Sequence, residues 1–243
     1  MKNSVPALTL TVTYNNMTFD NRLRTGWGFS CLVEGTEQTI LFDTGGDART
    51  LFGNMSLMGI DPSSVNIVFL SHIHGDHTGG LEGVLRKNPH ITVYVPESFP
   101  ISFQQAIASY GAKAHAVGNP IRLFDSVYSG GEMGQSIKEQ ALVVETSSGL
   151  VIITGCAHPG IVDMVREAKA RFKNDIHLVM GGFHLSGMSG LQIGEIITAL
   201  EQLGVKKVAP SHCTGERAMV LFQQAWGEDF LEGGAGAVIQ VPR

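Results

Sequence analysis

The hydrophobic and polar positions predict a chain that begins with strands and continues with alternating strands and helices. Residues 8–14 alternate between apolar and polar side chains, as expected for a strand with one buried face. Residues 66–70 form a short continuous apolar run, which is typical of a strand buried on both faces. The other predicted strands are 28–34, 38–43, 91–95, 141–146, 149–154, 176–180, 206–210 and 237–241. The predicted helices are 49–58, 79–86, 102–110, 160–172, 189–203 and 214–225, with Ser189 as an N-cap.

Because strands and helices occur in both halves of the chain, we expect two packed sheets with helices outside, in one domain spanning 1–243. Residues 96–140 interrupt this pattern with many Pro, Gly and Ser residues. We expect them to form an irregular excursion that caps a substrate. Their aromatic side chains could form a wall against a flat ring of the substrate. Alternatively, they could simply pack within this segment.

Composition narrows the class of partner. The net charge of −5 argues against non-specific nucleic-acid binding, which needs a basic face, but leaves a small anionic substrate open. Three widely spaced cysteines do not suggest a disulfide framework. The N-terminus lacks a continuous apolar stretch, and no run approaches the length of a membrane span. We therefore expect a cytoplasmic protein that binds neither nucleic acid nor membrane.

The strongest chemical signal lies in SHIHGDHTGG, residues 71–80, directly after the predicted buried strand 66–70. Six of the nine histidines follow the end of a predicted apolar strand, where open α/β sheets build their sites. A lone histidine would be more simply explained as a surface or core group. A run of three histidines and an aspartate just past a strand instead indicates a metal site.

The spacing within this run favours two ions. His72 and His74 are two residues apart, so on an extended segment they project to the same side. Asp76 and His77 come after Gly75, where the chain can turn, and can therefore face a second ion. Imidazole and carboxylate groups suit Zn²⁺, Fe²⁺ or Mn²⁺, and we expect one or two such ions, with zinc first.

SHIHGDHTGG resembles the signature of the metallo-β-lactamase superfamily. LFDTG (41–45), GCAHPGI (155–161) and PSHCTG (210–215) resemble further motifs of that family. The resemblance implies an α/β fold, an αββα sandwich of two mixed β-sheets flanked by helices. Together with GGFHL (181–185), the later motifs resemble more narrowly the subgroup of 7,8-dihydropterin-6-methyl-4-(β-D-ribofuranosyl)aminobenzene 5′-phosphate synthases.

The resemblance also implies two sets of metal ligands. The first ion would be held by His72, His74 and His158. The second would be held by Asp76, His77 and His212. Asp43 would orient a ligand from outside the metal sites, the alternative being an Asp that only forms a turn.

The chain departs from the family in one place. Most members with two metals carry a bridging carboxylate after the strand that follows the third histidine, but LVMGGFHL (178–185) has no Asp or Glu. Either His184 takes part, as a ligand or a substrate contact, or a water alone bridges the ions, and a site with one ion stays possible. Cys156 and Cys213 flank predicted ligands. They could be thiolates stabilised by a cation or simply small buried residues.

The predicted function is a metal-dependent hydrolase of a small, phosphorylated ester. Two ions would lower the pKa of a bound water, so that hydroxide is available near neutral pH. Asp76 and His184 are the predicted catalytic side chains, with Asp76 both binding metal and steering the proton of the water. One alternative is a transferase that joins a dihydropterin diphosphate to an aminobenzene ribotide with loss of pyrophosphate. A second is a non-catalytic metal-binding protein. The expected partner is a small molecule, phosphorylated or pterin-like.

Overall fold

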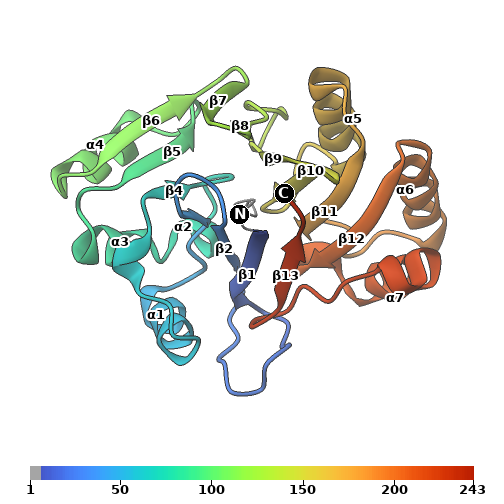
Figure 1. Ribbon diagram of the computed structural model, residues 1–243, viewed down its shortest axis with the longest axis horizontal. Helices are drawn as coiled ribbons and strands as arrows, with labels where there is room; N and C mark the ends of the chain where they lie inside the picture. Colours follow the sequence, from blue (N-terminus) through green and yellow to red (C-terminus); the bar gives the residue numbers. More distant parts are fainter. Residues whose placement is uncertain (1–6) are drawn as a thin grey trace, which may run out of the picture.

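The computed structural model describes residues 7–243 and contains two β-sheets packed face to face between two layers of helices (Figure 1). Residues 1–6, at the start of the stretch expected not to form a signal peptide, lie outside the described residues. In sheet order, the first sheet comprises β13 (Val238–Val241), β1 (Leu8–Asn15), β2 (Phe29–Glu34), β3 (Ile40–Phe42), β4 (Ile67–Phe69), β5 (Thr92–Pro96) and β6 (Lys113–Val117). The second comprises β12 (Val205–Ser211), β11 (Ile176–Gly182), β10 (Gly149–Thr154), β9 (Leu142–Thr146), β8 (Val127–Ser129) and β7 (Ile121–Phe124).

Both sheets are mixed, as predicted. β3 to β6 pair in parallel, whereas β13, β1 and β2 pair antiparallel. In the second sheet β10, β11 and β12 are parallel, and β7, β8 and β9 are antiparallel. The helices are α1 (Ala48–Leu57), α2 (Gly75–Thr78), α3 (Leu81–Lys87), α4 (Ile101–Ser109), α5 (Ile161–Phe172), α6 (Gly190–Gln202) and α7 (Glu216–Trp226). The αββα sandwich is thereby confirmed.

Three hydrophobic cores follow from this layering. Side chains such as Phe42 and Val151 fill the space between the sheets. Their neighbours along the strands point outward, so that Leu41 packs under α1, α3 and α4, and Ile152 packs under α5, α6 and α7. This alternation explains the continuous apolar runs of the central strands, because both of their faces are buried. The predicted Ser189 N-cap is confirmed, and Gln192 completes a capping box with it.

The expectation of an irregular segment at 96–140 is wrong. The helix predicted over 102–110 forms as α4, but the strands β6, β7 and β8 form as well; β6 is the last strand of the first sheet and β7 the last strand of the second. The chain passes from one sheet to the other between them (Figure 1). Both are edge strands in which at most one residue is fully buried, which removes the continuous apolar signal that marks a buried strand.

One aromatic residue of that segment belongs to a core and the others pack against the cores, which supports the packing alternative. Phe99, Phe103 and Tyr110 pack under the helices of the first sheet. Phe124 packs between the sheets, and Tyr128 packs on the other side of the second sheet. The substrate-capping role of 96–140 stays a prediction. Among the described helices, none has the length and apolar character needed to span a membrane.

Candidate metal centre

The predicted site residues meet where parallel strands of both sheets end. β3 and β4 deliver Asp43 and the segment 71–80, while β10 and β12 deliver His158 and His212. Since the carboxyl ends of parallel strands lie at the same edge of a sheet, loops far apart in sequence converge there. All six predicted ligands and Asp43 lie in this one region.

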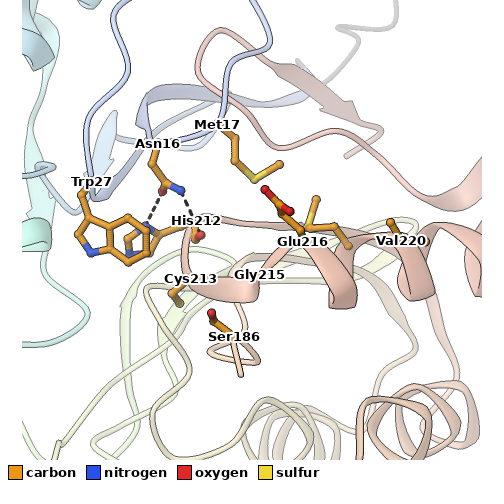
Figure 2. A pocket seen from close by; sticks show the side chains of 10 residues that line it. Asn16, Met17, Trp27, Ser186, His212, Cys213, Gly215, Glu216 and Val220 are labelled. Carbon is orange, nitrogen blue, oxygen red and sulfur yellow. Dashed lines mark hydrogen bonds between the residues drawn. The ribbon is translucent and has the colours of Figure 1, made fainter. Parts of the chain in front are cut away.

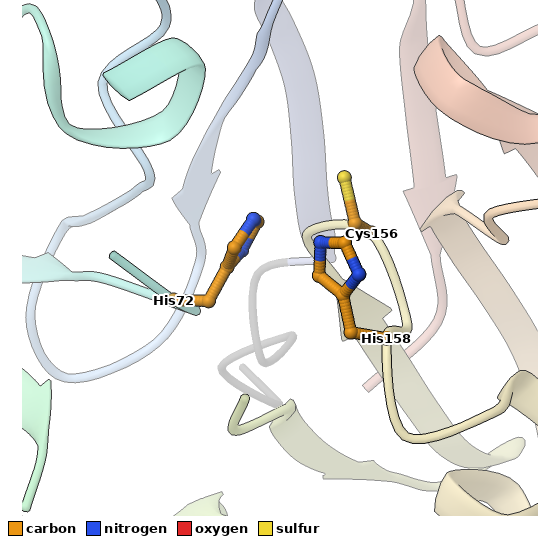
Figure 3. A group of neighbouring side chains, drawn as sticks. All are labelled: His72, Cys156 and His158. Atoms are coloured by element: carbon orange, nitrogen blue, oxygen red, sulfur yellow. The ribbon is translucent and has the colours of Figure 1, made fainter. Parts of the chain in front are cut away.

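The first cluster contains His72, His74 and His158. His72 Nε2 lies 3.1 Å from His74 Nδ1, and the His158 ring lies 4.8 Å from the His72 ring, centroid to centroid. His72 and His158 face each other from the two sheets (Figure 3). Among the described residues, His158 Nε2 is the buried side-chain polar atom that has no hydrogen-bond partner. Leaving such an atom unpaired costs about 1–3 kcal/mol, which a bound cation would remove.

The hydrogen bonds of Ser71 determine which nitrogen of His72 faces the cluster. Ser71 Oγ donates to Asp43 Oδ2 at 2.7 Å, so its only hydrogen is used. His72 Nδ1, at 2.9 Å, must therefore donate to Ser71 Oγ. The lone pair of the neutral ring then lies on Nε2 and points toward His74.

The second cluster contains Asp76, His77 and His212. His77 Nε2 lies 3.2 Å from His212 Nε2, and Asp76 Oδ2 lies 3.3 Å from His212 Nε2 and 3.6 Å from His77 Nε2. Both imidazoles are buried, whereas the Asp76 side chain stays 21% exposed. This cluster therefore has one side open to solvent.

The far nitrogens of these two imidazoles are held by other side chains. Asp43 Oδ2 accepts from His77 Nδ1 at 2.7 Å. Asn16 Oδ1 accepts from His212 Nδ1 at 2.8 Å, because Asn16 Nδ2 donates to the His212 carbonyl oxygen. In their neutral forms both rings then turn an Nε2 lone pair toward the same point. Two lone pairs facing each other at 3.2 Å repel unless a cation or a proton lies between them, so this donor set fits a metal ion.

Glu139 is a functional candidate that the sequence pattern did not reveal. Its carboxylate is fully buried, and Oε1 accepts from the backbone N–H groups of Gly155, Cys156 and Ala157 at 2.9 Å. Its Oε2 accepts from His158 N–H at 3.0 Å. Four N–H groups of one loop therefore converge on a single carboxylate. Glu139 positions the loop that carries Cys156 and His158.

Burial and charge set the protonation states. Burial and neighbouring imidazoles lower the pKa of His72 and bring the pKa of His158 to about 4, so both rings are neutral at pH 7. Burial also disfavours a charged His77, but the Asp43 carboxylate outweighs it and raises the pKa of that ring. For Asp76 burial is outweighed by His212 and His77, and the pKa of this carboxyl falls to about 2.

Cys156 and His184 complete the centre. Cys156 Sγ lies 3.3 Å from His77 Nε2 and within 4.8 Å of nitrogen atoms of both histidine clusters. The His184 ring lies 4.3 Å from the His158 ring, and a third cluster joins His184 with Cys156 and Cys213. Of the two alternatives for the cysteines, this geometry favours a thiol among the donor atoms for Cys156.

The backbone is strained at the same place. Asp43, Ala157, His184 and His212 have φ values of 51°, 57°, 54° and 53°, a left-handed conformation uncommon for residues other than glycine. Such conformations persist only where surrounding contacts enforce them, and they cluster at functional sites. Gly155 is required for packing, since a Cβ there would lie 2.0 Å from Ser71 Oγ.

A cavity of about 740 Å³ opens beside His212 (Figure 2). Its lining residues are Asn16, Met17, Trp27, Ser186, His212, Cys213, Gly215, Glu216, Met219 and Val220. The Trp27 ring lies 4.9 Å from the His212 ring and is 60% exposed. The cavity wall thus comes from the loop after β1 and from the segments after β11 and β12, outside the 96–140 segment. A smaller cavity of about 180 Å³ lies beside His158 and His184.

Comparison with known proteins shows what this chain is similar to. The sequence model of the metallo-beta-lactamase superfamily matches residues 26–168. The 7,8-dihydropterin-6-methyl-4-(beta-D-ribofuranosyl)-aminobenzene-5'-phosphate synthase of Methanocaldococcus jannaschii is 33% identical over 262 residues, covering 88% of this chain and 89% of the relative. A solved structure of a metal-dependent hydrolase of the beta-lactamase superfamily has a TM-score of 0.82 at 27% identity, covering 97% of this chain and 100% of that one. The short form of human tRNase Z has a TM-score of 0.65 at 15% identity, covering 97% and 100%, a likeness of fold alone.

Proposed function

Because the chain belongs to the metallo-β-lactamase superfamily, we propose that it is an enzyme that uses one or two divalent metal ions to act on a small phosphorylated molecule. The first ion would be held by His72, His74 and His158. The second would be held by Asp76, His77 and His212. Zinc is the first expectation, and iron or manganese would suit the same ligands.

The unpartnered Nε2 of His158 carries this proposal. It is buried, it faces the His72 ring, and hydrogen bonds within the described part of the chain leave it unsatisfied. The facing Nε2 atoms of His77 and His212 support a second ion in the same way. Asp43 and Asn16 would orient these two ligands by accepting from their Nδ1 atoms.

We place hydrolysis first among the reactions. Divalent ions in such a site lower the pKa of water and polarise a phosphoryl oxygen. Asp76 is partly exposed and lies beside both Nε2 atoms of the second cluster, so its carboxylate would accept the proton of the attacking water. His184 would donate a proton to the leaving group, because it lies next to His158 beside the smaller cavity and its interaction with the Cys213 sulfur raises the pKa of its imidazole.

The coupling of a dihydropterin diphosphate to an aminobenzene ribotide is the second candidate. The synthase similar to this chain favours it, and so does the larger cavity. The exposed Trp27 ring offers a flat apolar surface for a planar heterocycle, and Met17 and Met219 extend that surface. No lysine or arginine is among the described lining residues, so the charge of a diphosphate would be balanced chiefly by the ions.

One assay separates these reactions. Metal-loaded protein is supplied with a dihydropterin diphosphate and an arylamine ribotide, and in parallel with simple phosphodiesters, while products are followed by liquid chromatography. We expect phosphodiester turnover that is absent in His158→Ala. A coupled pterin–arylamine product would instead establish the transferase. If the protein binds metal but turns over neither kind of substrate, the proposal of a hydrolase or transferase is refuted. The alternative of a non-catalytic metal-binding protein would then stand.

A further inference from the structure

The region in which the sequence lacks an acidic residue is filled by sulfur and backbone atoms. Gly182, at the end of β11, occupies the stretch without Asp or Glu. A Cβ on Gly182 would lie 2.4 Å from the Gly155 carbonyl oxygen, 2.7 Å from Cys213 Sγ and 3.2 Å from Cys156 Cα. A carboxylate side chain therefore has no room at this position. The loop after β10 occupies the space instead.

Cys156 connects the two histidine clusters. Its Sγ lies within 4.8 Å of donor atoms of His72 and His158 in one cluster, and of His77 and His212 in the other. The contact to His77 Nε2 is 3.3 Å. Among the described residues that form candidate metal groups, Cys156 is the member common to all of them.

We propose that the Cys156 thiolate is a ligand shared by the two metal ions, in place of a bridging carboxylate. The inference rests on the proposed metal centre. Thiolate sulfur binds zinc and other borderline-soft ions at about 2.3 Å and has lone pairs for two of them. At the first ion, where His72, His74 and His158 are all neutral ligands, a thiolate would supply a negative charge from the protein itself. The thiolate adds one negative charge between the ions.

A hydrogen bond and a close backbone approach fix the position of Cys156 in addition to its packing. The buried Glu139 carboxylate accepts from the Cys156 N–H at 2.9 Å, and Gly155 allows the loop to approach Ser71 closely. Cys213 is different, since its Sγ points to the Cys156 carbonyl oxygen at 3.8 Å and joins neither histidine cluster. Cys213 therefore serves as a matched control, a second buried thiol in the same centre.

Cobalt(II) substitution tests the assignment through a spectroscopic signal that is independent of activity. Metal-free protein, kept reduced, is titrated with Co²⁺, and bound cobalt is measured by elemental analysis while the near-ultraviolet sulfur-to-cobalt charge-transfer band is recorded. We expect the band in the unaltered protein and in Cys213→Ala. It should disappear in Cys156→Ser, a nearly isosteric change, while His-bound cobalt remains detectable.

The possible failures are distinct. If the unaltered protein binds cobalt without a charge-transfer band, or if the band survives in Cys156→Ser and is lost in Cys213→Ala, the assignment of Cys156 is overturned and the histidine sites stand. If the unaltered protein binds neither cobalt nor zinc, the proposed metal centre is refuted together with the assignment of Cys156. Circular dichroism of each variant shows that the comparison is made between folded proteins.

Discussion

Glu139→Gln tests whether one buried carboxylate holds the loop that carries Cys156 and His158. Glutamine has nearly the same shape, so its Oε1 can still accept from the three N–H groups of Gly155, Cys156 and Ala157. Its amide nitrogen, however, must face the His158 N–H, which now donates to Oε2 at 3.0 Å. The substitution therefore removes a charge from three hydrogen bonds and replaces the fourth by a donor–donor contact.

The magnitude follows from these four bonds. A hydrogen bond to a charged group contributes about 1.5–3 kcal/mol and a neutral one about 1 kcal/mol, so the three retained bonds lose roughly 1.5–6 kcal/mol together. The unsatisfied His158 N–H costs about 1–3 kcal/mol more, and relief from burying a charge offsets part of the sum. We expect the free energy of unfolding to fall by about 3 kcal/mol, a large share of the 5–15 kcal/mol typical of a domain.

The assay is urea unfolding of the metal-free protein, followed by metal titration of the folded variant. Glu201→Gln, on an exposed position of α6, is the matched control and should change stability by less than about 0.5 kcal/mol. We also expect Glu139→Gln to weaken metal binding, because His158 belongs to the loop that is released. A stability within about 0.5 kcal/mol of the unaltered protein, with unchanged metal affinity, would refute the role given to Glu139.

Three further predictions concern the centre itself. Asp43→Asn should lower metal affinity about 10–100-fold, because it disturbs the partner of His77 Nδ1, and competition with a chelator measures this; equal affinity would contradict it. In metal-free protein, stability should fall as the pH drops from about 6.5 toward 4, since the lowered pKa values of His72 and His158 make the unfolded chain bind protons that the folded chain rejects. Urea midpoints at pH 6.5 and 5 check this, and a midpoint that rises on acidification is the opposing result. Trp27→Ala should raise KM while leaving metal content unchanged, and an unchanged KM would remove Trp27 from the substrate site.

The sequence predicted which residues come together in those parts of the candidate site that depend on local pattern. The run His72 to His77 follows a buried strand directly, and the apolar signal of that strand is continuous. Each later motif likewise comes at the end of a strand buried on both faces. Because the carboxyl ends of parallel strands lie at one edge of a sheet, the prediction of the strands alone indicated that these motifs would converge.

The parts that the sequence did not reveal depend on contacts between distant positions. Asn16 lies 196 residues from its partner His212, in a loop that shows no motif. Glu139 lies 19 residues before His158, in a segment with neither periodicity nor a recognisable ligand pattern. The sequence singled out Cys156 as a neighbour of a predicted ligand, but only the fold shows that its sulfur lies near both histidine clusters. The edge strands β6 and β7 were not predicted for a related reason, since partial exposure to solvent interrupts the apolar pattern of their sequences.

The central claim is that these side chains hold metal, and the metal content of the purified protein tests it most directly. Elemental analysis should find one to two equivalents of zinc, iron or manganese, and the content should fall in His72→Ala and in His158→Ala with the fold retained. Protein that is free of metal and resists reconstitution, or normal metal content in both variants, would contradict the account.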